Sequence, residues 1–250
     1  MAAARVKQPI DALYAQLLSA YGPQGWWPLS SKAGKRGFDA RGYHPEVFVH
    51  PRTAEDRFEI VMGATLTQNS AWTNAEAALA RLHEAGIRLP ADVHSCPRGR
   101  LARLIRSSGY YNQKARKLKE IAALFRSTGS LAQGAALSRE DLLSCWGIGP
   151  ETADSILLYA FRLPFFVVDA YTRRLLDRTG IVEGAQQRSY DQIQQAFLDA
   201  LPHTHQLFNE YHALIVEHAK RHCRAKPLCN GCPVLVCRYR DSARALPRPP

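Results

Sequence analysis

The sequence predicts an all-α fold. Apolar residues recur at helical spacing along nearly the whole chain, and no run of alternating apolar and polar residues is long enough to make a sheet. Capping residues, prolines and glycines stand where these periodic segments end. The predicted helices are Ile10–Ala20, Ala54–Gln68, Thr73–Ala85, Leu101–Ser107, Gln113–Phe125, Arg139–Cys145, Glu151–Phe161, Tyr171–Thr179, Tyr190–Leu201 and His205–His222.

The connections between these helices are uneven in length. Residues 22–51 form a long segment rich in Gly, Pro and Lys, which predicts a functional loop or a mobile one. Residues 241–250 are expected to be a disordered tail. At 250 residues the chain can bury a full core, as one large domain or as two smaller lobes.

The charge of the chain points to a polyanionic partner. The formal net charge is +11, and residues 98–119 carry eight Lys or Arg and no acid. Such a run is commonly a solvated helix face, but it can also bind nucleic acid. No apolar run is long enough for a membrane span, and the first residues lack the apolar core of a signal peptide. We therefore expect a cytoplasmic protein without membrane contact.

A turn with two glycines joins two of the predicted helices. Gly147-Ile148-Gly149 cannot continue a helix, and Pro150 suits the first turn of the next one. Such a turn presents backbone N–H groups and a helix N-terminus, which together favour phosphate. The segment is therefore predicted to be a helix-hairpin-helix that binds nucleic acid.

An isolated aspartate follows the second of these helices. Asp169 comes directly after the apolar run of residues 165–168, so its carboxylate is expected at the edge of an apolar wall. That is a suitable place for a reactive acid. It is equally suitable for the N-cap of the helix that begins at Tyr171.

Four cysteines lie within fifteen residues near the C-terminal end. They follow the pattern C-x5-C-x2-C-x4-C, and such density in a cytoplasmic chain indicates metal rather than disulfides. Zinc sites commonly show two C-x2-C pairs and this loop has one, so the spacing favours a [4Fe–4S] cluster over zinc. The predicted ligands are Cys223, Cys229, Cys232 and Cys237.

Together these motifs resemble the helix-hairpin-helix DNA glycosylase superfamily that includes endonuclease III. The resemblance rests on WGIGPETA, on VVDAY with Asp169, on LIRSSGYYNQKARKLKEIA and on the cysteine loop, which is one residue shorter on each side than is usual. It implies two helical lobes, a monomer acting on double-stranded DNA in the nucleoid, and a damaged base flipped between the lobes. We expect a continuous six-helix lobe at 52–163, a second lobe from 1–51 and 164–222, and the cluster loop at 223–237.

Glu151 departs from the bifunctional members of this superfamily. They carry a lysine at this position, which forms a Schiff base with the sugar before the strand is cut. A carboxylate cannot form an imine, so lyase chemistry by this route should be absent. Another amine, such as Lys114, could still cleave slowly. The resemblance assigns catalysis to Asp169 and Glu151.

A second set of residues resembles the short bacterial 3-methyladenine DNA glycosylases. The similar segments are the Trp-Trp-Pro element at Trp26, LTQNSAW, YNQKA and GIGPETADSILLYA. The resemblance implies that Trp72 and one of Trp26 or Trp27 sandwich the flipped base, while Gln68 probes the gap in the duplex. Those enzymes use a modified lysine where this chain has Leu214, and Lys220 is the nearest candidate. The predicted DNA contacts are Gln68, Asn69, Tyr111, Asn112, Lys114, Gly147, Ile148 and Gly149.

The sequence thus predicts a monofunctional DNA N-glycosylase of base excision repair with alkylated purines as substrate. Alternatives remain: removal of mispaired thymine or uracil, removal of oxidised pyrimidines, and a non-catalytic iron–sulfur protein that binds damaged DNA. The tryptophans could also be core residues, and Gln68 and Asn69 could cap a helix.

Overall fold

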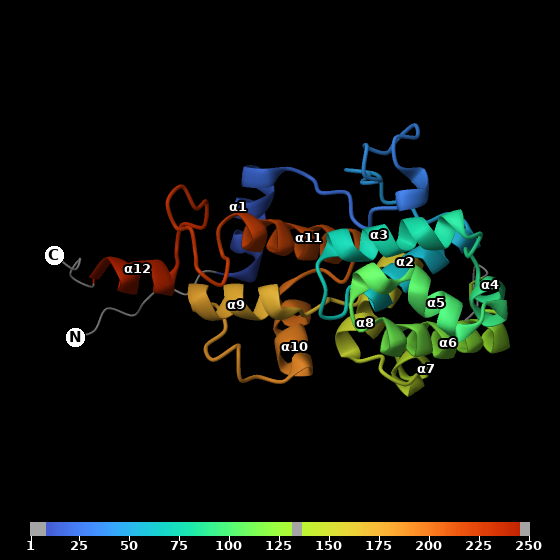
Figure 1. Cartoon of the computed structure of the whole chain (residues 1–250). Coiled ribbons are helices and arrows are strands. Elements are labelled where there is room, and N and C mark those ends of the chain that lie inside the picture. The colour runs from blue at the N-terminus through green and yellow to red at the C-terminus, as the bar shows by residue number, and fades with distance from the viewer. Residues whose placement is uncertain (1–8, 132–136, 246–250) are drawn as a thin grey trace. The chain divides into compact units, whose positions relative to one another are not determined.

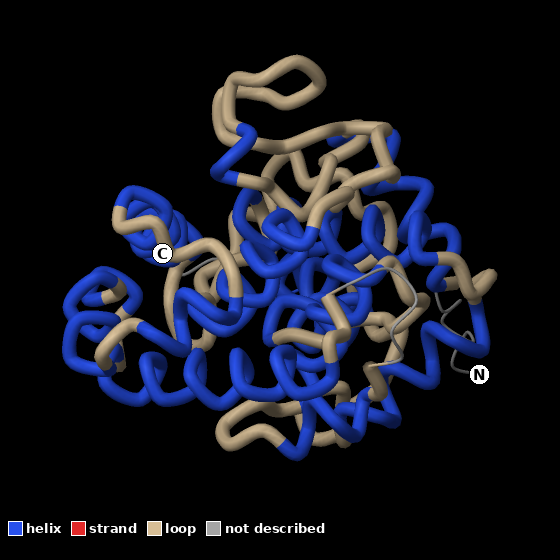
Figure 2. Tube along the Cα trace, turned by 90° about the vertical axis from the view of Figure 1, so that its right-hand side faces the viewer, coloured by secondary structure: helices blue, strands red, loops and turns tan. Residues whose placement is uncertain are grey.

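The computed structural model describes residues 9–131 and 137–245, and this part of the chain contains helices and loops without a strand (Figure 1, Figure 2). The all-α prediction is therefore confirmed. None of the helices in these ranges combines the length and the apolar character that a membrane crossing requires.

The chain divides into two compact units. One unit is formed by residues 25–165, and the other combines the residues up to 24 with those from 166 onward. This division differs from the predicted lobes in residues 25–51 and 164–165, which were expected with the discontinuous lobe. For residues 25–51 the difference arises because this segment packs on helices of the continuous unit, as described below.

The unit of residues 25–165 is built around α2. Thr53 caps this helix in a reciprocal pair of hydrogen bonds with Asp56, and every residue from 56 to 66 is buried. Helices α3, α6 and α8 pack against α2. The helices of this unit are α2 (Ala54–Leu66), α3 (Trp72–Glu84), α4 (Pro90–Ser95), α5 (Arg98–Leu104), α6 (Tyr111–Thr128), α7 (Arg139–Ser144) and α8 (Pro150–Ser155), with short turns η1 (Ser30–Lys32), η2 (Arg106–Ser108) and η3 (Ile156–Ala160).

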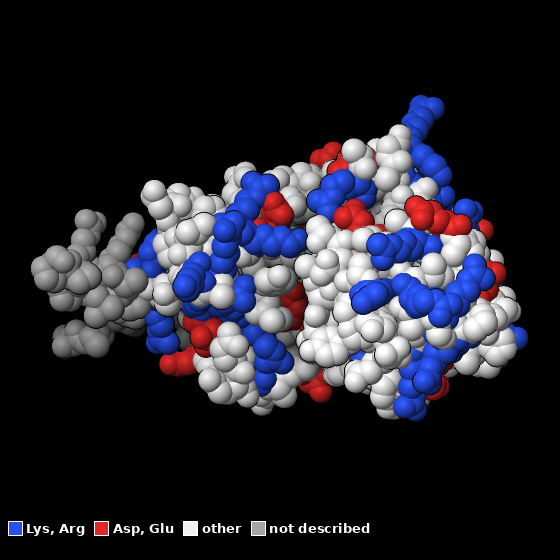
Figure 3. All heavy atoms as spheres, in the orientation of Figure 1, with Lys and Arg blue, Asp and Glu red and all other residues white. Residues whose placement is uncertain are grey.

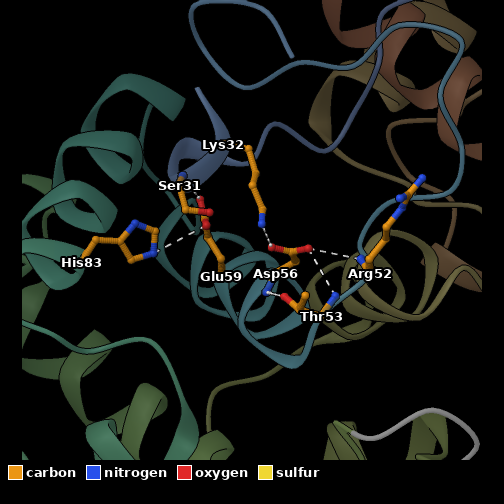
Figure 4. Close-up of polar contacts among 7 residues, drawn as sticks. All are labelled: Ser31, Lys32, Arg52, Thr53, Asp56, Glu59 and His83. Atoms are coloured by element: carbon orange, nitrogen blue, oxygen red, sulfur yellow. Dashed lines mark hydrogen bonds and ion pairs between the residues drawn. The ribbon is translucent and has the colours of Figure 1, made fainter. Parts of the chain in front are cut away.

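A buried polar cluster anchors η1 to this unit (Figure 4). Lys32 Nζ lies 3.2 Å from Asp56 Oδ1, and Ser31 N donates to Glu59 Oε1 at 3.2 Å. The other carboxylate oxygen of Glu59 lies 3.5 Å from His83 Nε2 on α3. Burial raises the pKa of Glu59. These contacts explain why the segment around residue 30 belongs to the continuous unit.

The second unit is built around α11, which packs against α1 and α9. Phe208 and Tyr211 of α11 are fully buried, and Tyr211 Oη donates to Ile10 O at 2.6 Å. The helices of this unit are α1 (Ile10–Tyr21), α9 (Ala170–Thr179), α10 (Tyr190–Ala200), α11 (His205–Arg221) and α12 (Arg238–Ala245). Helix α12 extends to Ala245, within the segment expected to be disordered, and residues 246–250 lie outside the described ranges.

Candidate functional site

The glycine turn between α7 and α8 is a hairpin in which the two glycines have different roles. Gly147 has a φ of +79°, and a Cβ there would lie 2.5 Å from Lys117 Cε. Gly149 is extended, at φ −101°, and forms the N-cap of α8. Ile148 is 6% exposed and its N–H donates to Cys145 O at 3.1 Å. Its side chain therefore anchors the hairpin from inside, and any DNA contact at Ile148 is left to the backbone.

Glu151 stands in the first turn of α8, where its side chain is exposed. Pro150 precedes it at the first helical position, and Ser155 Oγ donates to Glu151 O at 2.7 Å. An acid in this first turn is favoured by the helix dipole, so the position has a structural reason as well as a chemical one.

Gln68 connects the C-terminal end of α2 to the hairpin. Its Nε2 donates to Gly147 O at 3.1 Å and to Thr152 Oγ1 at 2.8 Å. Its Oε1 accepts from Lys117 Nζ at 2.5 Å. These three contacts occupy both ends of the amide. Gln68 must therefore exchange them before it can enter a duplex.

Lys114 lies in the interior rather than on the DNA-contacting surface predicted for it. Its side chain is 2% exposed, and Nζ donates to Leu66 O at 2.7 Å and to Ser108 O at 2.6 Å. Burial and the nearby charge of Lys117 lower the pKa of Lys114 to about 8. In this conformation the two carbonyls enclose the ammonium group of Lys114, so it is not presented to a phosphate or to a sugar.

Tyr110 is a surface residue that the sequence analysis missed. It is 68% exposed and holds a left-handed backbone at φ +44°, directly before α6. Tyr111 begins α6 and is half-buried, whereas Asn112 is exposed. Asn69 is also exposed and left-handed, at φ +50°. The available signal was Gly109, which marks a turn before an aromatic pair.

Trp27 is the central member of an aromatic group in the unit of residues 25–165. Its ring packs edge-to-face on Trp72, with centroids 5.3 Å apart, and its centroid lies 5.1 Å from that of Tyr159. Trp27 is 7% exposed and rests on Gly63, where a Cβ would lie 3.2 Å from the indole nitrogen. Trp26 and Trp72 are half-buried. Of the adjacent pair, Trp26 is therefore the more exposed.

Asp169 caps α9 with one carboxylate oxygen and faces a histidine with the other. Oδ1 accepts from Thr172 N at 2.7 Å and from Thr172 Oγ1 at 2.9 Å, while Oδ2 lies 3.5 Å from His212 Nε2. Burial alone would raise the pKa of Asp169, but His212 and Thr172 outweigh it and lower the pKa below the ordinary value. Asp169 is thus both an N-cap and a carboxylate held in its anionic form.

Lys220 lies apart from this carboxylate. It follows His212 by eight residues on α11, which is roughly 12 Å along a helix. Its side chain is exposed, and its backbone carbonyl accepts from Arg224 Nε at 2.6 Å. The structure therefore places His212, and not Lys220, beside Asp169. Asp169 is 43 residues away from His212 in the sequence, so the sequence carries no local signal of its position beside Asp169.

The four cysteines of the C-terminal loop line one pocket, and none of them is in a disulfide. Arg178 of α9 donates to Cys223 Sγ at 3.5 Å and to Arg224 O at 2.6 Å, so it fixes the start of the loop. Other walls of the pocket are apolar, from Leu175, Leu228 and Val234. Within the described ranges, no three His, Cys, Asp or Glu side chains are grouped closely enough to hold a single metal ion. Four thiols around one apolar-walled pocket fit the donor set of an iron–sulfur cluster.

Basic side chains gather on one face of the unit of residues 25–165, over α5 (Figure 3). Arg98, Arg100, Arg103 and Arg106 are exposed there. Arg116 of α6 stacks on the exposed ring of Trp146 beside the hairpin, with its guanidinium 4.0 Å from the ring centroid. Positive charge therefore accompanies the elements that carry the candidate DNA contacts.

The sequence as a whole is similar to base excision repair proteins. A family model described as "HhH-GPD superfamily base excision DNA repair protein" matches residues 62–203. The "Putative DNA repair glycosylase MJ1434" of Methanocaldococcus jannaschii is 38% identical over 232 residues, which covers 90% of this chain and 93% of the relative.

Solved structures resemble the fold. The H. pylori 3-methyladenine DNA glycosylase MagIII bound to 1,N6-ethenoadenine is 29% identical, with a TM-score of 0.58 over 68% of this chain and 90% of the other. A trapped endonuclease III–DNA covalent intermediate has a TM-score of 0.72 at 23% identity, covering 96% of this chain and 99% of the other. The second likeness concerns the fold alone.

Proposed function

Since this chain belongs to the HhH-GPD superfamily of base excision DNA repair proteins, we propose that it is a monofunctional DNA N-glycosylase that removes alkylated purines. The proposal rests on the presence of two carboxylates in the chain. Asp169 is held in its anionic form, and Glu151 occupies the position where bifunctional members of the superfamily have lysine.

Asp169 supplies the chemistry of base release. Positive charge develops on the sugar as the glycosidic bond breaks, and a carboxylate held in its anionic form stabilises that charge. The same group can orient or deprotonate the attacking water. The low pKa of Asp169 supports this role, because the carboxylate stays charged well below neutral pH.

Glu151 limits the reaction to base removal. A carboxylate has no nucleophilic nitrogen, and Lys114, the other amine considered, is enclosed by Leu66 O and Ser108 O. The strand is therefore left uncut by imine chemistry at these positions.

The indole rings support an alkylated purine as substrate. 3-Methyladenine carries positive charge, and an indole face attracts a cation by roughly 0.5–2 kcal/mol. The rings of Trp26 and Trp72 are half-buried, and the ring of Trp27 packs edge-to-face against that of Trp72. The likeness to an H. pylori 3-methyladenine DNA glycosylase supports the same class of base. Because the glycosidic bond of such a base is already weak, recognition and sugar stabilisation suffice.

Duplex DNA is held by the hairpin and by exposed residues near it. Space is open where a side chain of Gly149 would stand, so the hairpin backbone is accessible there, and the N-terminus of α8 favours phosphate. Gln68, Asn69, Asn112, Tyr111 and the exposed Tyr110 are the candidates for contacts with bases and sugars around the lesion. The base must leave the stack to be cut, which costs a few kcal/mol and favours weakly paired sites.

Cys223, Cys229, Cys232 and Cys237 would hold a [4Fe–4S] cluster. When bound, the cluster supplies a covalent staple for a loop that is too short to have its own core. Arg178 orients the first ligand residue by its contact with Cys223 Sγ.

A lesion panel with parallel borohydride trapping tests the proposed function. Purified protein should release 3-methyladenine from alkylated DNA in single-turnover assays without forming a trapped adduct. Asp169→Asn should slow release by roughly 10²- to 10⁴-fold while the Kd for DNA stays nearly unchanged. Unchanged turnover in this variant would show that Asp169 is not the catalytic carboxylate.

The same panel separates the alternatives. Release of thymine, uracil or oxidised pyrimidines instead of alkylated purines would keep the reaction type and replace the substrate. Tight binding to damaged or abasic DNA without release of any base, at any excess of protein, would indicate a non-catalytic damage-binding protein.

A further inference from the structure

The two oxygens of the Asp169 carboxylate are in different environments. Oδ1 forms the N-cap of α9 and accepts hydrogen bonds from Thr172 N and Thr172 Oγ1. Oδ2 is turned away from the helix and lies 3.5 Å from His212 Nε2. The hydrogen bonds of the N-cap therefore fix Oδ1 but not Oδ2, which is the oxygen that stays available to the reaction.

His212 lies on a buried part of α11 and is directed toward Oδ2. Its side chain is 6% exposed, that of Asp169 is 12% exposed, and α9 and α11 pack against one another. A histidine in so buried a position has little rotational freedom. The 3.5 Å separation from Oδ2 is an ion-pair distance rather than a formed hydrogen bond, and catalytic contacts are commonly this long before substrate binds.

Other charged and titratable groups on the surrounding elements have partners of their own. Glu210 of α11 accepts from Gln24 N at 2.6 Å, and Tyr190 of α10 accepts from Val168 N at 3.3 Å. On α9, Arg173 donates to Arg188 O at 2.6 Å and Arg174 donates to Cys223 O at 2.7 Å. His212, by contrast, lies opposite Oδ2 of Asp169 at 3.5 Å.

We propose that His212 is a positioning residue for Asp169, which holds Oδ2 in place and keeps the carboxylate anionic at the pH of the reaction. The expected effect on the rate of base release rests on the proposed function, whereas the contact between His212 and Asp169 rests on the geometry alone. An imidazole that donates to Oδ2 prevents rotation of the carboxylate about the bond that the N-cap leaves free. It also favours the charged form of the acid, which the developing sugar cation requires.

Three variants test this role. His212→Leu fills the site with an apolar side chain and removes the donor, His212→Ala removes it with less bulk, and His212→Gln retains an N–H donor. His203, which lies in the same unit and contacts Leu198 O near the surface, provides the matched control His203→Gln. Thermal unfolding identifies which variants are folded.

The first readout does not depend on activity. The Asp169 carboxyl carbon is followed by NMR across acid pH, and its signal is identified by its loss in Asp169→Asn. We expect the pKa of Asp169 to rise by about 1 unit or more in His212→Leu and His212→Ala, because an adjacent donor is removed. His212→Gln should restore part of the difference. An Asp169 titration that is the same in wild type and in the folded leucine and alanine variants would overturn the proposal.

The second readout is single-turnover base release as a function of pH. We expect the maximum rate to fall about tenfold to hundredfold in His212→Leu, with the Kd for DNA unchanged, since a displaced carboxylate still lies in the same site. The acid limb of the profile should move to higher pH with the Asp169 pKa. An unaltered rate and limb would overturn the kinetic part. If wild type releases no base from any lesion, the proposed function fails while the NMR result still decides the contact.

Discussion

Lys114 Nζ lies 2.7 Å from the backbone carbonyl oxygen of Leu66, and this contact joins α6 to the last turn of α2. The same ammonium group reaches Ser108 O at 2.6 Å, in the turn before Tyr110. One buried lysine therefore ties together the two loops that carry Gln68 and Tyr110. Its role is to shape the candidate DNA-binding surface from beneath.

Replacement of this lysine should destabilise the unit of residues 25–165. Lys114→Met leaves two buried carbonyls without a donor, which we expect to cost roughly 1–3 kcal/mol in the free energy of unfolding. Lys119→Met is the matched control, because Lys119 lies on the same helix and contacts a single, exposed carbonyl at His94. Urea unfolding of both variants measures the difference. Equal losses in the two would contradict the role given to Lys114.

The buried amine also predicts a dependence of stability on pH. Its pKa of about 8 in the folded protein lies below the ordinary lysine value of about 10.4. The unfolded chain therefore binds more protons between these values, so the contribution of Lys114 to stability rises with pH from about 8 to about 10.4. The free energy of unfolding of wild type minus that of Lys114→Met, measured at pH 7.5 and pH 10, should increase. A flat difference would contradict the assigned pKa.

The two adjacent tryptophans should respond differently to truncation. Trp27 is nearly buried between Gly63 and Tyr159, so Trp27→Ala should lower the free energy of unfolding by about 3–5 kcal/mol. Trp26→Ala should instead leave stability nearly intact and weaken capture of the base by roughly 1–3 kcal/mol. Unfolding measurements and single-turnover release at varied DNA concentration separate the two effects. Loss of base capture without loss of stability at Trp27 would reverse the assignment.

Much of this arrangement could be predicted because the signals are local. The hairpin follows from two glycines and a proline within four residues, and Gly147 does adopt the positive φ that they indicate. The helix after Asp169 begins where an N-cap was expected. The grouping of the four cysteines was predictable in the same way, since they lie within fifteen consecutive residues.

Contacts between distant residues were not predictable in the same way. His212 and Asp169 are 43 residues apart, and no periodic pattern joins them. Lys114 was predicted to contact DNA because of its charge, although it falls on the apolar face of α6 with Leu118, Ile121 and Phe125 at i+4, i+7 and i+11. This spacing indicates that Lys114 is buried, whereas its positive charge indicates exposure. The structure agrees with the spacing.

The cysteine loop should carry iron, and its loss should be measurable without any assay of activity. The purified protein should absorb at about 400 nm, as iron–sulfur proteins do. Cys232→Ser should remove most of this absorbance and the bound iron, whereas Cys96→Ser, a buried thiol outside the loop, should retain both. Stoichiometric zinc without iron in the wild type would replace the cluster with a zinc staple.

Glu151 offers a gain-of-function test of the reaction type. Its side chain is exposed in the first turn of α8, so a lysine there meets no packing obstacle and opposes the helix dipole by less than about 1 kcal/mol. Glu151→Lys supplies the amine that the wild type lacks at this position. The amine attacks the anomeric carbon as the bond to the base breaks, the sugar ring opens to give an imine, and borohydride reduces the imine to a stable adduct.

We expect an adduct with lesion DNA for Glu151→Lys and none for wild type or for Glu151→Gln, as resolved on a denaturing gel. The double variant Glu151→Lys/Asp169→Asn should lose the adduct, because base release still depends on the Asp169 carboxylate. Trapping of the wild-type protein as efficient as that of Glu151→Lys would mean that another amine reaches the sugar. Since Lys114 is enclosed by two carbonyls, that result would require a different amine and would remove the basis of the monofunctional proposal.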